Sequence, residues 1–212
     1  DIDWLPIVEE TGFIPNLGTI TELVAQRAKL LWLNYPNNPT GVTAEIDFYE
    51  ACVDWCNKHQ VLLASDNPYV DVTYDGYIAP SVLQVKRAKD CSIEFMSFSK
   101  TFNMGGWRLG AAVGNAKAID TLLQVKSNID SGHFRPIYDA GITAIDTTPR
   151  SWIDERNRIY ERRRDRILSV LPDIGLRAQK TKGSLYIWAY VEDSDGAGYV
   201  ENALMHAHVA FA

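Results

Sequence analysis

Cysteine, positive charge and long apolar runs are all scarce in this chain of 212 residues. The three cysteines are an odd number and lack the spacing of a disulfide framework, which excludes a small stapled secreted domain and favours a reducing, cytoplasmic location. A net charge of -6 gives no general attraction to nucleic acid or to an anionic membrane. No apolar run approaches the length of a membrane span. From the charge and the lack of such a run, we expect neither nucleic acid nor a membrane as a partner.

What the chain does contain is an alternation of short apolar runs and helical patterns, in a composition of 46% hydrophobic and 23% charged residues that is typical of globular proteins. We expect buried strands at residues 29–34, 61–66, 91–99 and 108–114. We expect helices at residues 43–59 (capped by Thr43), 116–128 and 135–146. This order predicts an α/β fold with a mixed, mostly parallel sheet flanked by helices.

The pattern changes near residue 148. A long charged helix is expected at residues 151–171, followed by strand-like runs at 176–180 and 184–191. We therefore predict a large domain at residues 1–147 and part of a smaller α+β domain at residues 148–212. Because the sequence opens without methionine and stops in the middle of a pattern, we interpret it as an internal piece of a longer protein, with both domains partial.

Two other patterns have simple structural explanations. The run "RNRIYERRRDR" is rich in arginine, but acidic residues interleave with it and Asp154 and Arg158 have helical pair spacing, so we expect a solvated, salt-bridged helix and not a nucleic-acid site. Cys52 and Cys56 lie four residues apart on a helix, yet no second pair of ligands is near, so we expect core packing and no metal site.

Polar side chains follow the ends of three expected strands. Asn38 follows the first strand, Asp66 and Tyr69 follow the second, and Lys100 and Arg108 follow the third. In open α/β sheets the carboxyl ends of the strands converge on one crevice, so we expect these groups to meet there.

Lys100 is the centre of this set. A lysine at a strand end is most often solvated, but partial burial disfavours the ammonium form and makes the amine a nucleophile towards carbonyl groups. The hydroxyls of Ser97 and Ser99 and the guanidinium of Arg108 lie near it in sequence and could bind an anion such as a phosphate.

Each of the other groups has a structural and a functional interpretation. Asp66 is either a turn former or a carboxylate that keeps a ring nitrogen of a heteroaromatic cofactor protonated. Tyr69 either packs in the core or donates its phenolic hydrogen to a ring oxygen. Asn38 belongs to an Asn-Pro turn, and its amide could donate into the same crevice.

Three segments, "NYPNNPTG", "SDNPY" and "SFSKTFNMGGWRLG", resemble signature elements of fold-type I, pyridoxal-phosphate-dependent aminotransferases of classes I and II. The last segment and "RRRD" resemble the diaminopimelate/aspartate aminotransferase-like branch. The resemblance runs through nearly the whole chain and implies a transferase-like large domain, pyridoxal 5'-phosphate as cofactor and a homodimer.

The resemblance also implies roles for the residues at the strand ends. Lys100 would bond the aldehyde of the cofactor as a Schiff base and later move the α-proton, and Asp66 would pair with the pyridinium nitrogen. Asn38 and Tyr69 would hydrogen-bond the ring oxygen. Ser97 and Arg108 would bind the phosphate, with Ser99 as a further candidate.

The activity implied is transfer of an amino group between an amino acid and a 2-oxo acid such as 2-oxoglutarate. Another fold-type I chemistry (a C–S lyase, a decarboxylase or an aminocyclopropane carboxylate synthase-like reaction) stays open, because these motifs specify the cofactor and not the fate of the bound amino acid. A catalytically incomplete piece also stays open, since the family's glycine/serine phosphate loop, stacking aromatic residue and carboxylate-binding arginine are expected outside this chain.

Overall fold

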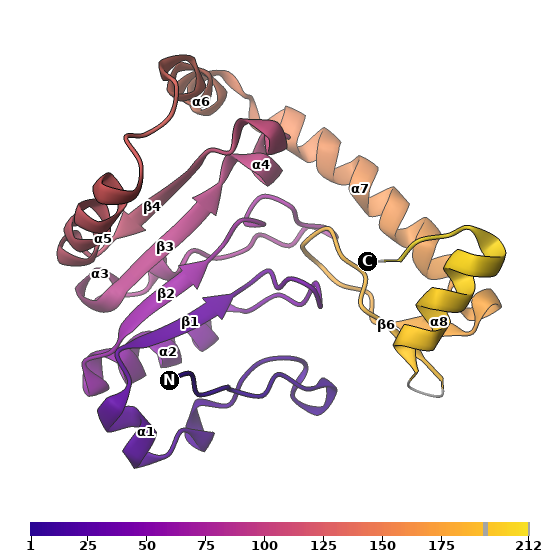
Figure 1. Cartoon of the computed structure of the whole chain (residues 1–212), viewed down its shortest axis with the longest axis horizontal. Coiled ribbons are helices and arrows are strands. Elements are labelled where there is room, and N and C mark those ends of the chain that lie inside the picture. Colours follow the sequence, from indigo (N-terminus) through magenta and orange to yellow (C-terminus); the bar gives the residue numbers. More distant parts are fainter. Residues whose placement is uncertain (193–194, 212) are drawn as a thin grey trace.

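The computed structural model describes residues 1–192 and 195–211, and its main feature is a four-stranded sheet (Figure 1). The strands are β1 (Leu30–Asn34), β2 (Leu62–Asp66), β3 (Ser92–Ser97) and β4 (Gly110–Gly114), in the order β1-β2-β3-β4. The first three strands are parallel and β4 is antiparallel to β3. The expected mixed, mostly parallel sheet is confirmed.

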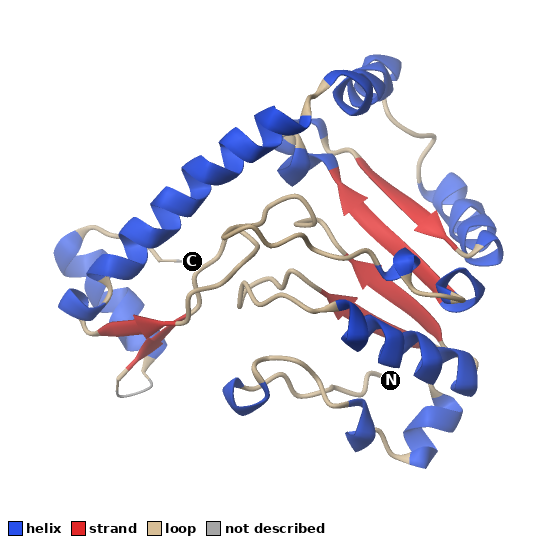
Figure 2. Ribbon diagram, turned by 180° about the vertical axis from the view of Figure 1, so that it is seen from behind, coloured by secondary structure: helices blue, strands red, loops and turns tan. Residues whose placement is uncertain are grey.

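Helices surround this sheet and lead away from it (Figures 1 and 2). They are α1 (Glu22–Arg27), α2 (Ile46–His59), α3 (Ala88–Cys91), α4 (Phe98–Thr101), α5 (Ala116–Ile129), α6 (Arg135–Thr147), α7 (Arg150–Val170) and α8 (Gly196–Asn202). A second, antiparallel sheet pairs β5 (Leu176–Ala178) with β6 (Ala189–Val191). In Figure 1, α5 and α6 lie on the β4 side, and α7 runs from α4 towards β6 and α8.

The core lies between α2 and the sheet. Tyr49, Val53 and Cys56 recur on one face of α2 and are buried against Leu33 and Leu63 of the strands. Cys52 is fully buried in the same cluster, and Cys91 at the end of α3 joins it.

The three cysteines are free thiols inside this core. Burial raises the pKa of the Cys52 thiol to about 12, because the thiolate is disfavoured away from water. No group of three or more potential metal ligands occurs in the described part of the chain.

The opposite face of β1 is open, which corrects the expectation of a buried strand at residues 29–34. Leu30 and Trp32 are half exposed, at 50% and 55%, whereas Leu31 and Leu33 are buried, because successive side chains point to opposite faces of a strand. Trp32 instead stacks on Phe95 of β3, with ring centroids 5.5 Å apart. β4 is also largely exposed.

Several element boundaries differ from those expected. β4 begins at Gly110 and not at residue 108, β5 ends at Ala178, and β6 covers only Ala189–Val191 of the expected run at 184–191. The cap of α2 is Glu45 and not Thr43, whose hydroxyl interacts with Tyr77 instead. The expected strand at residues 91–99 begins at Ser92 and ends at Ser97, since the Ser97 hydroxyl accepts a hydrogen bond from Ser99 N and starts the short helix α4. Ser99 therefore lies on a helix.

The expectation of a fully solvated α7 is wrong at two arginines. Arg156 and Arg164 are only 5% and 4% exposed, and both bond groups from the first half of the chain. Asp154 pairs with Arg150 and not with Arg158. No helix within the described ranges is long and apolar enough to cross a membrane.

The division near residue 148 stays a prediction. α6 ends at Thr147 and α7 begins at Arg150, as that division requires. Contacts nevertheless cross it, because Thr73 and Gly183 form a β-bridge and Arg164 binds Asp75.

Gly114 gives a test of the β3–β4 pairing. Its φ of 143° is one that other residues rarely adopt, and an added Cβ would lie 2.3 Å from the carbonyl oxygen of Ser92. We expect Gly114→Ala to lower the free energy of unfolding by about 3 kcal/mol, measured by urea denaturation. Gly196→Ala is the control, since nothing lies within 4 Å of its added Cβ; equal effects of the two changes would contradict the strand geometry.

Candidate active site

The candidate site lies at the carboxyl edge of the parallel strands. The register aligns Asn34 with Asp66 and Asp66 with Phe95, so β1, β2 and β3 end close together. The loops that leave these strands extend towards α7 (Figure 1). Asn38 and Tyr69 lie after β1 and β2, and Lys100 lies on α4 directly after β3.

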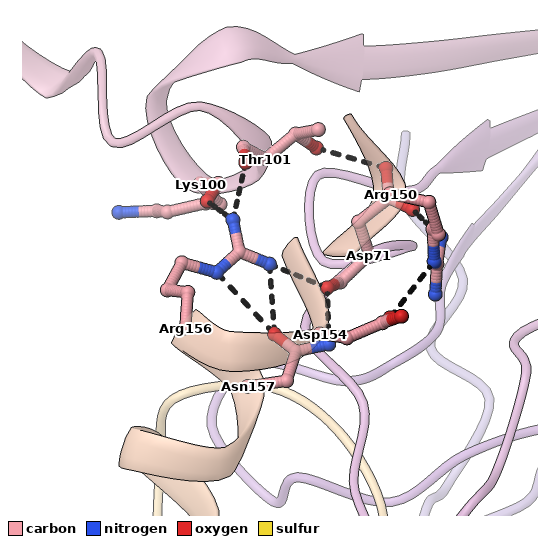
Figure 3. Close-up of polar contacts among 7 residues, drawn as sticks. All are labelled: Asp71, Lys100, Thr101, Arg150, Asp154, Arg156 and Asn157. Carbon is pink, nitrogen blue, oxygen red and sulfur yellow. Dashed lines mark hydrogen bonds and ion pairs between the residues drawn. The ribbon is translucent and has the colours of Figure 1, made fainter. Parts of the chain in front are cut away.

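Lys100 lies on α4, directly after β3, and is partly buried. Its ammonium nitrogen is 5.9 Å from the centroid of the Tyr69 ring. Its carbonyl oxygen accepts a hydrogen bond of 2.7 Å from Arg156 Nη1. Figure 3 shows the amine pointing away from Arg156, so the main chain of Lys100 is held while its amine is directed elsewhere.

Tyr69 joins three of the expected groups. It is buried, and its hydroxyl donates a hydrogen bond of 3.1 Å to the Tyr186 hydroxyl. Burial, the Tyr186 hydroxyl and the nearby Asp66 carboxylate raise the pKa of Tyr69, while the Asn38 side chain lowers it. The phenol is therefore kept neutral, and its one hydrogen is donated to Tyr186 in this structure.

Asp66 is the last residue of β2, and burial raises the pKa of its carboxyl group above the usual value. Among the described residues, its carboxylate has no hydrogen bond or ion pair. The main chain around Asp66 is fixed by Asn34. The Asn34 side chain donates a hydrogen bond of 2.8 Å to Asp66 O and accepts one of 2.7 Å from Asn38 N. Asn34 thus ties the ends of β1 and β2 to the Asn38 loop.

The expected phosphate-binding residues are brought near one another by the β3–β4 pairing. Ser97 of β3 pairs with Gly110 of β4, and Phe98 N donates a hydrogen bond of 3.1 Å to Leu109 O. Ser97 and Arg108 therefore lie at adjoining strand ends. Arg108 is exposed, has a left-handed φ of 54°, and donates through Nη1 to Gly105 O at 3.0 Å. Within the described ranges its guanidinium has no hydrogen bond to Ser97, Ser99 or Lys100.

Three residues of the site lie outside the expected set. Asn34 was assigned only to a strand, Tyr186 only to a strand-like run, and Arg156 to a solvated face. The first had a signal, because Asn34 ends a strand beside the same crevice. For Tyr186 and Arg156 no local pattern indicates a contact with residues 117 and 56 positions earlier in the chain.

The raised pKa of Asp66 gives a pH-dependent prediction. In the folded chain this carboxyl group holds its proton more tightly than in the unfolded chain, so its contribution to stability is present below the ordinary pKa of 3.8 and is lost as the pH rises through the raised value. Asp66→Asn cannot ionise and escapes that loss. We expect the cofactor-free variant to unfold at higher urea concentration than the unchanged protein at neutral pH, with the difference vanishing towards pH 3.8.

Asp120→Asn is the matched control, because Asp120 is exposed on α5. It should follow the unchanged protein at each pH. An Asp66→Asn variant that is the less stable one at neutral pH would show that the carboxylate is held by favourable contacts.

Comparison with known proteins gives matches that span nearly the whole chain. The family described as aminotransferase class I and II matches residues 7–209. An LL-diaminopimelate aminotransferase of Trichormus variabilis is 47% identical over 187 residues, which are 88% of this chain and 48% of that protein. One of Moorella thermoacetica is 43% identical over 207 residues, or 97% and 53% of the two chains.

Solved structures agree with these matches. Apo-BacF of Bacillus subtilis superposes with a TM-score of 0.91 at 34% identity, covering 97% of this chain and 53% of that one. A probable N-succinyldiaminopimelate aminotransferase of Thermus thermophilus has a TM-score of 0.81 at 34% identity, covering 91% and 50%. The chain spans about half the length of the curated relatives it matches. It belongs to the family of class I and II aminotransferases.

Proposed function

We propose that this chain provides the cofactor-binding core of a pyridoxal-phosphate-dependent aminotransferase, which transfers an amino group between an amino acid and a 2-oxo acid. Pyridoxal phosphate is the cofactor of the family. The observation that carries the proposal is the position of the Lys100 amine, 5.9 Å from the ring of a tyrosine that also interacts with Asn38 and Asp66. One amine, one acid and two hydrogen-bond donors thus gather at one edge of the sheet.

The chemistry of these groups fits the cofactor. Burial raises the pKa of the Asp66 carboxyl group, so a positively charged N–H partner would stabilise its ionised form. A pyridinium nitrogen is such a partner. The neutral hydroxyl of Tyr69 and the amide of Asn38 are suited to a ring oxygen. Ser97, Ser99 and Arg108 offer hydroxyls and an exposed guanidinium for a phosphate.

The roles of the residues follow from these positions. When bound, pyridoxal phosphate supplies a carbonyl carbon that bonds amines and a ring that accepts an electron pair. The Lys100 Nζ would hold the cofactor through that carbon, with the carbonyl oxygen leaving as water. Once the amino group of the substrate displaced it, the free Lys100 amine would take the α-proton as a general base. The Asp66 carboxylate would keep the ring nitrogen protonated, which would make the ring a better electron acceptor.

For the amino donor we propose LL-diaminopimelate or a related diamino acid, because the relatives of Trichormus variabilis and Moorella thermoacetica bear the name LL-diaminopimelate aminotransferase. 2-Oxoglutarate is the proposed acceptor. A cytoplasmic location is supported by the three free, buried cysteines. A homodimer is proposed from the family alone, and sedimentation of the whole protein would test it.

A half-reaction assay on the whole protein separates the possible chemistries. Addition of the amino donor should convert the bound cofactor to its aminated form, seen as a change in absorbance, and addition of 2-oxoglutarate should restore the first spectrum. Release of pyruvate and ammonia would instead indicate a lyase. An unchanged spectrum with every donor tried would refute aminotransfer.

Lys100→Ala tests the central assignment. Reduction of the loaded protein with borohydride should attach cofactor covalently to the unchanged protein and not to the variant, because the variant lacks the amine that bonds the aldehyde. Mass spectrometry of peptides measures the adduct. Lys117→Ala, which removes an exposed lysine of α5, should keep full labelling; labelling of the Lys100→Ala variant at another lysine would overturn the assignment.

Arg108→Lys tests the phosphate site. A lysine presents a point charge in place of the planar two-pronged donor, so the affinity for pyridoxal phosphate should fall on the order of tenfold. Fluorescence titration of the cofactor-free protein measures the dissociation constant. Arg162→Lys, at an exposed position of α7, is the control and should leave it unchanged; an unchanged constant for Arg108→Lys would remove Arg108 from the phosphate site.

A further inference from the structure

A buried arginine of α7 holds the main chain of residues 100–103, which we call the Lys100 segment. Arg156 is 5% exposed. Its Nη1 donates to the carbonyl oxygens of both Lys100, at 2.7 Å, and Thr101. These two carbonyls belong to the last turn of the short helix α4, where no N–H group of the helix can donate to them. Arg156 supplies the donors that the helix lacks.

The same guanidinium reaches the loop that carries Tyr69. Its Nη2 donates to the carbonyl oxygen of Asp71, two residues after Tyr69, at 2.6 Å. Asn157 supports this contact, since its Nδ2 donates to the same carbonyl at 2.9 Å and its Oδ1 accepts from Arg156 Nη2 at 2.8 Å and Nε at 3.3 Å. All five N–H groups of the guanidinium are thus used, as Figure 3 shows.

The partners of Arg156 are neutral oxygens. Among the described residues it has no ion pair, because the Asp71 carboxylate is directed to Arg150 Nη1 at 3.0 Å and to the Thr101 hydroxyl at 3.3 Å (Figure 3). Burial accordingly lowers the pKa of Arg156. A buried cation without a carboxylate partner costs free energy, and what it provides here is a five-point geometric link among three chain segments.

A second contact joins α7 to the same segment. Tyr160 lies one helical turn after Arg156, and the centroid of its ring is 5.9 Å from the Arg156 guanidinium carbon. The Tyr160 hydroxyl donates a hydrogen bond of 3.3 Å to Asn103 Oδ1. The Lys100 segment is therefore attached to α7 at both of its ends, while the Lys100 amine stays outside these contacts.

We propose that Arg156 is a positioning residue for the reaction: it fixes the main chain of Lys100 relative to the Tyr69 loop and makes the placement of the Lys100 amine depend on the position of α7. The inference rests on the proposed function only in that Lys100 must carry the chemistry. A planar fork with five donors is required, because three separate carbonyls and an amide must be held at once.

The first test uses the cofactor-free protein and needs no activity. The amides of Phe102 and Met104 bond the carbonyl of Phe98 at 3.1 and 3.4 Å, so their hydrogen exchange reports the order of the Lys100 segment. We expect Arg156→Gln to accelerate this exchange on the order of tenfold or more. Arg150→Gln removes a neighbour that, among the described residues, binds the carboxylates of Asp71 and Asp154 and no carbonyl of this segment, so it should leave the exchange unchanged.

Arg164→Gln is the second control. Arg164 is equally buried on α7, but it binds Asp75 and Thr181 O and not the Lys100 segment. It should lower thermal stability without the local acceleration. Should Arg156→Gln fail to fold, Arg156→Lys serves in its place, since it keeps the charge but not the fork, and it should still accelerate the exchange of Phe102 and Met104.

The second test uses the whole protein loaded with pyridoxal phosphate. Arg156→Gln should lower kcat by ten- to a hundredfold with KM changed far less, and should shift the pH midpoint of the cofactor's absorbance, because misplacement of a reacting group costs about that much. Arg164→Gln should leave the midpoint in place. The inference would be overturned if Arg156→Gln and Arg164→Gln had the same hydrogen exchange, the same kcat and the same pH midpoint. It would also be overturned if Arg156→Lys behaved like the unchanged protein in all three measurements.

The two proposals fail in different ways. If the unchanged protein does not bond pyridoxal phosphate at Lys100, the proposed function is wrong, and the exchange experiment still decides whether Arg156 orders the segment. If the bond forms and the exchange of the Arg156 variants equals that of the controls, the function stands and the positioning role falls.

Discussion

The parallel pairing of β2 with β3 is the constraint on which the candidate site depends. Because Asp66 lies beside Phe95 in this register, the acid at the end of one strand and the lysine that follows the next are delivered to the same edge. A slip of one residue would turn Asp66 to the opposite face of the sheet. The core under α2 prevents such a slip, since Leu63 and Ser65 point into it and are fully buried.

Much of this arrangement could be predicted from the sequence. Strand ends and turn residues are local signals, so the positions of the strands along the chain, the mixed sheet and the gathering of Asn38, Asp66, Tyr69 and Lys100 were expected from them. The open face of β1 could not be predicted, because Leu30 and Trp32 are as apolar as their buried neighbours. The cap at Glu45 was missed because Thr43 is the better capping residue and is used elsewhere, by Tyr77.

The contacts that cross the chain were the least predictable. In the run from Arg156 to Arg166, each arginine has an acidic residue within about three positions, and only the tertiary fold distinguishes the two that are buried. Arg156 donates mainly to main-chain carbonyls, which carry no sequence signal. Arg164 binds Asp75, which lies 89 positions away in the chain. The chemistry proposed for Lys100 thus rests on local motifs, whereas the support of its main chain is a property of the folded structure.

The three thiols in the core have a practical meaning for experiments on this protein. Cys52, Cys56 and Cys91 are at most 8% exposed, and burial raises the pKa of each, so thiolate is scarce near neutrality and shielded from reagents. Maleimides therefore find no reactive thiol on the surface of the residues that the structure describes. A single cysteine introduced on the exposed face of α5 would carry a fluorescent dye selectively, with no need to remove the native ones.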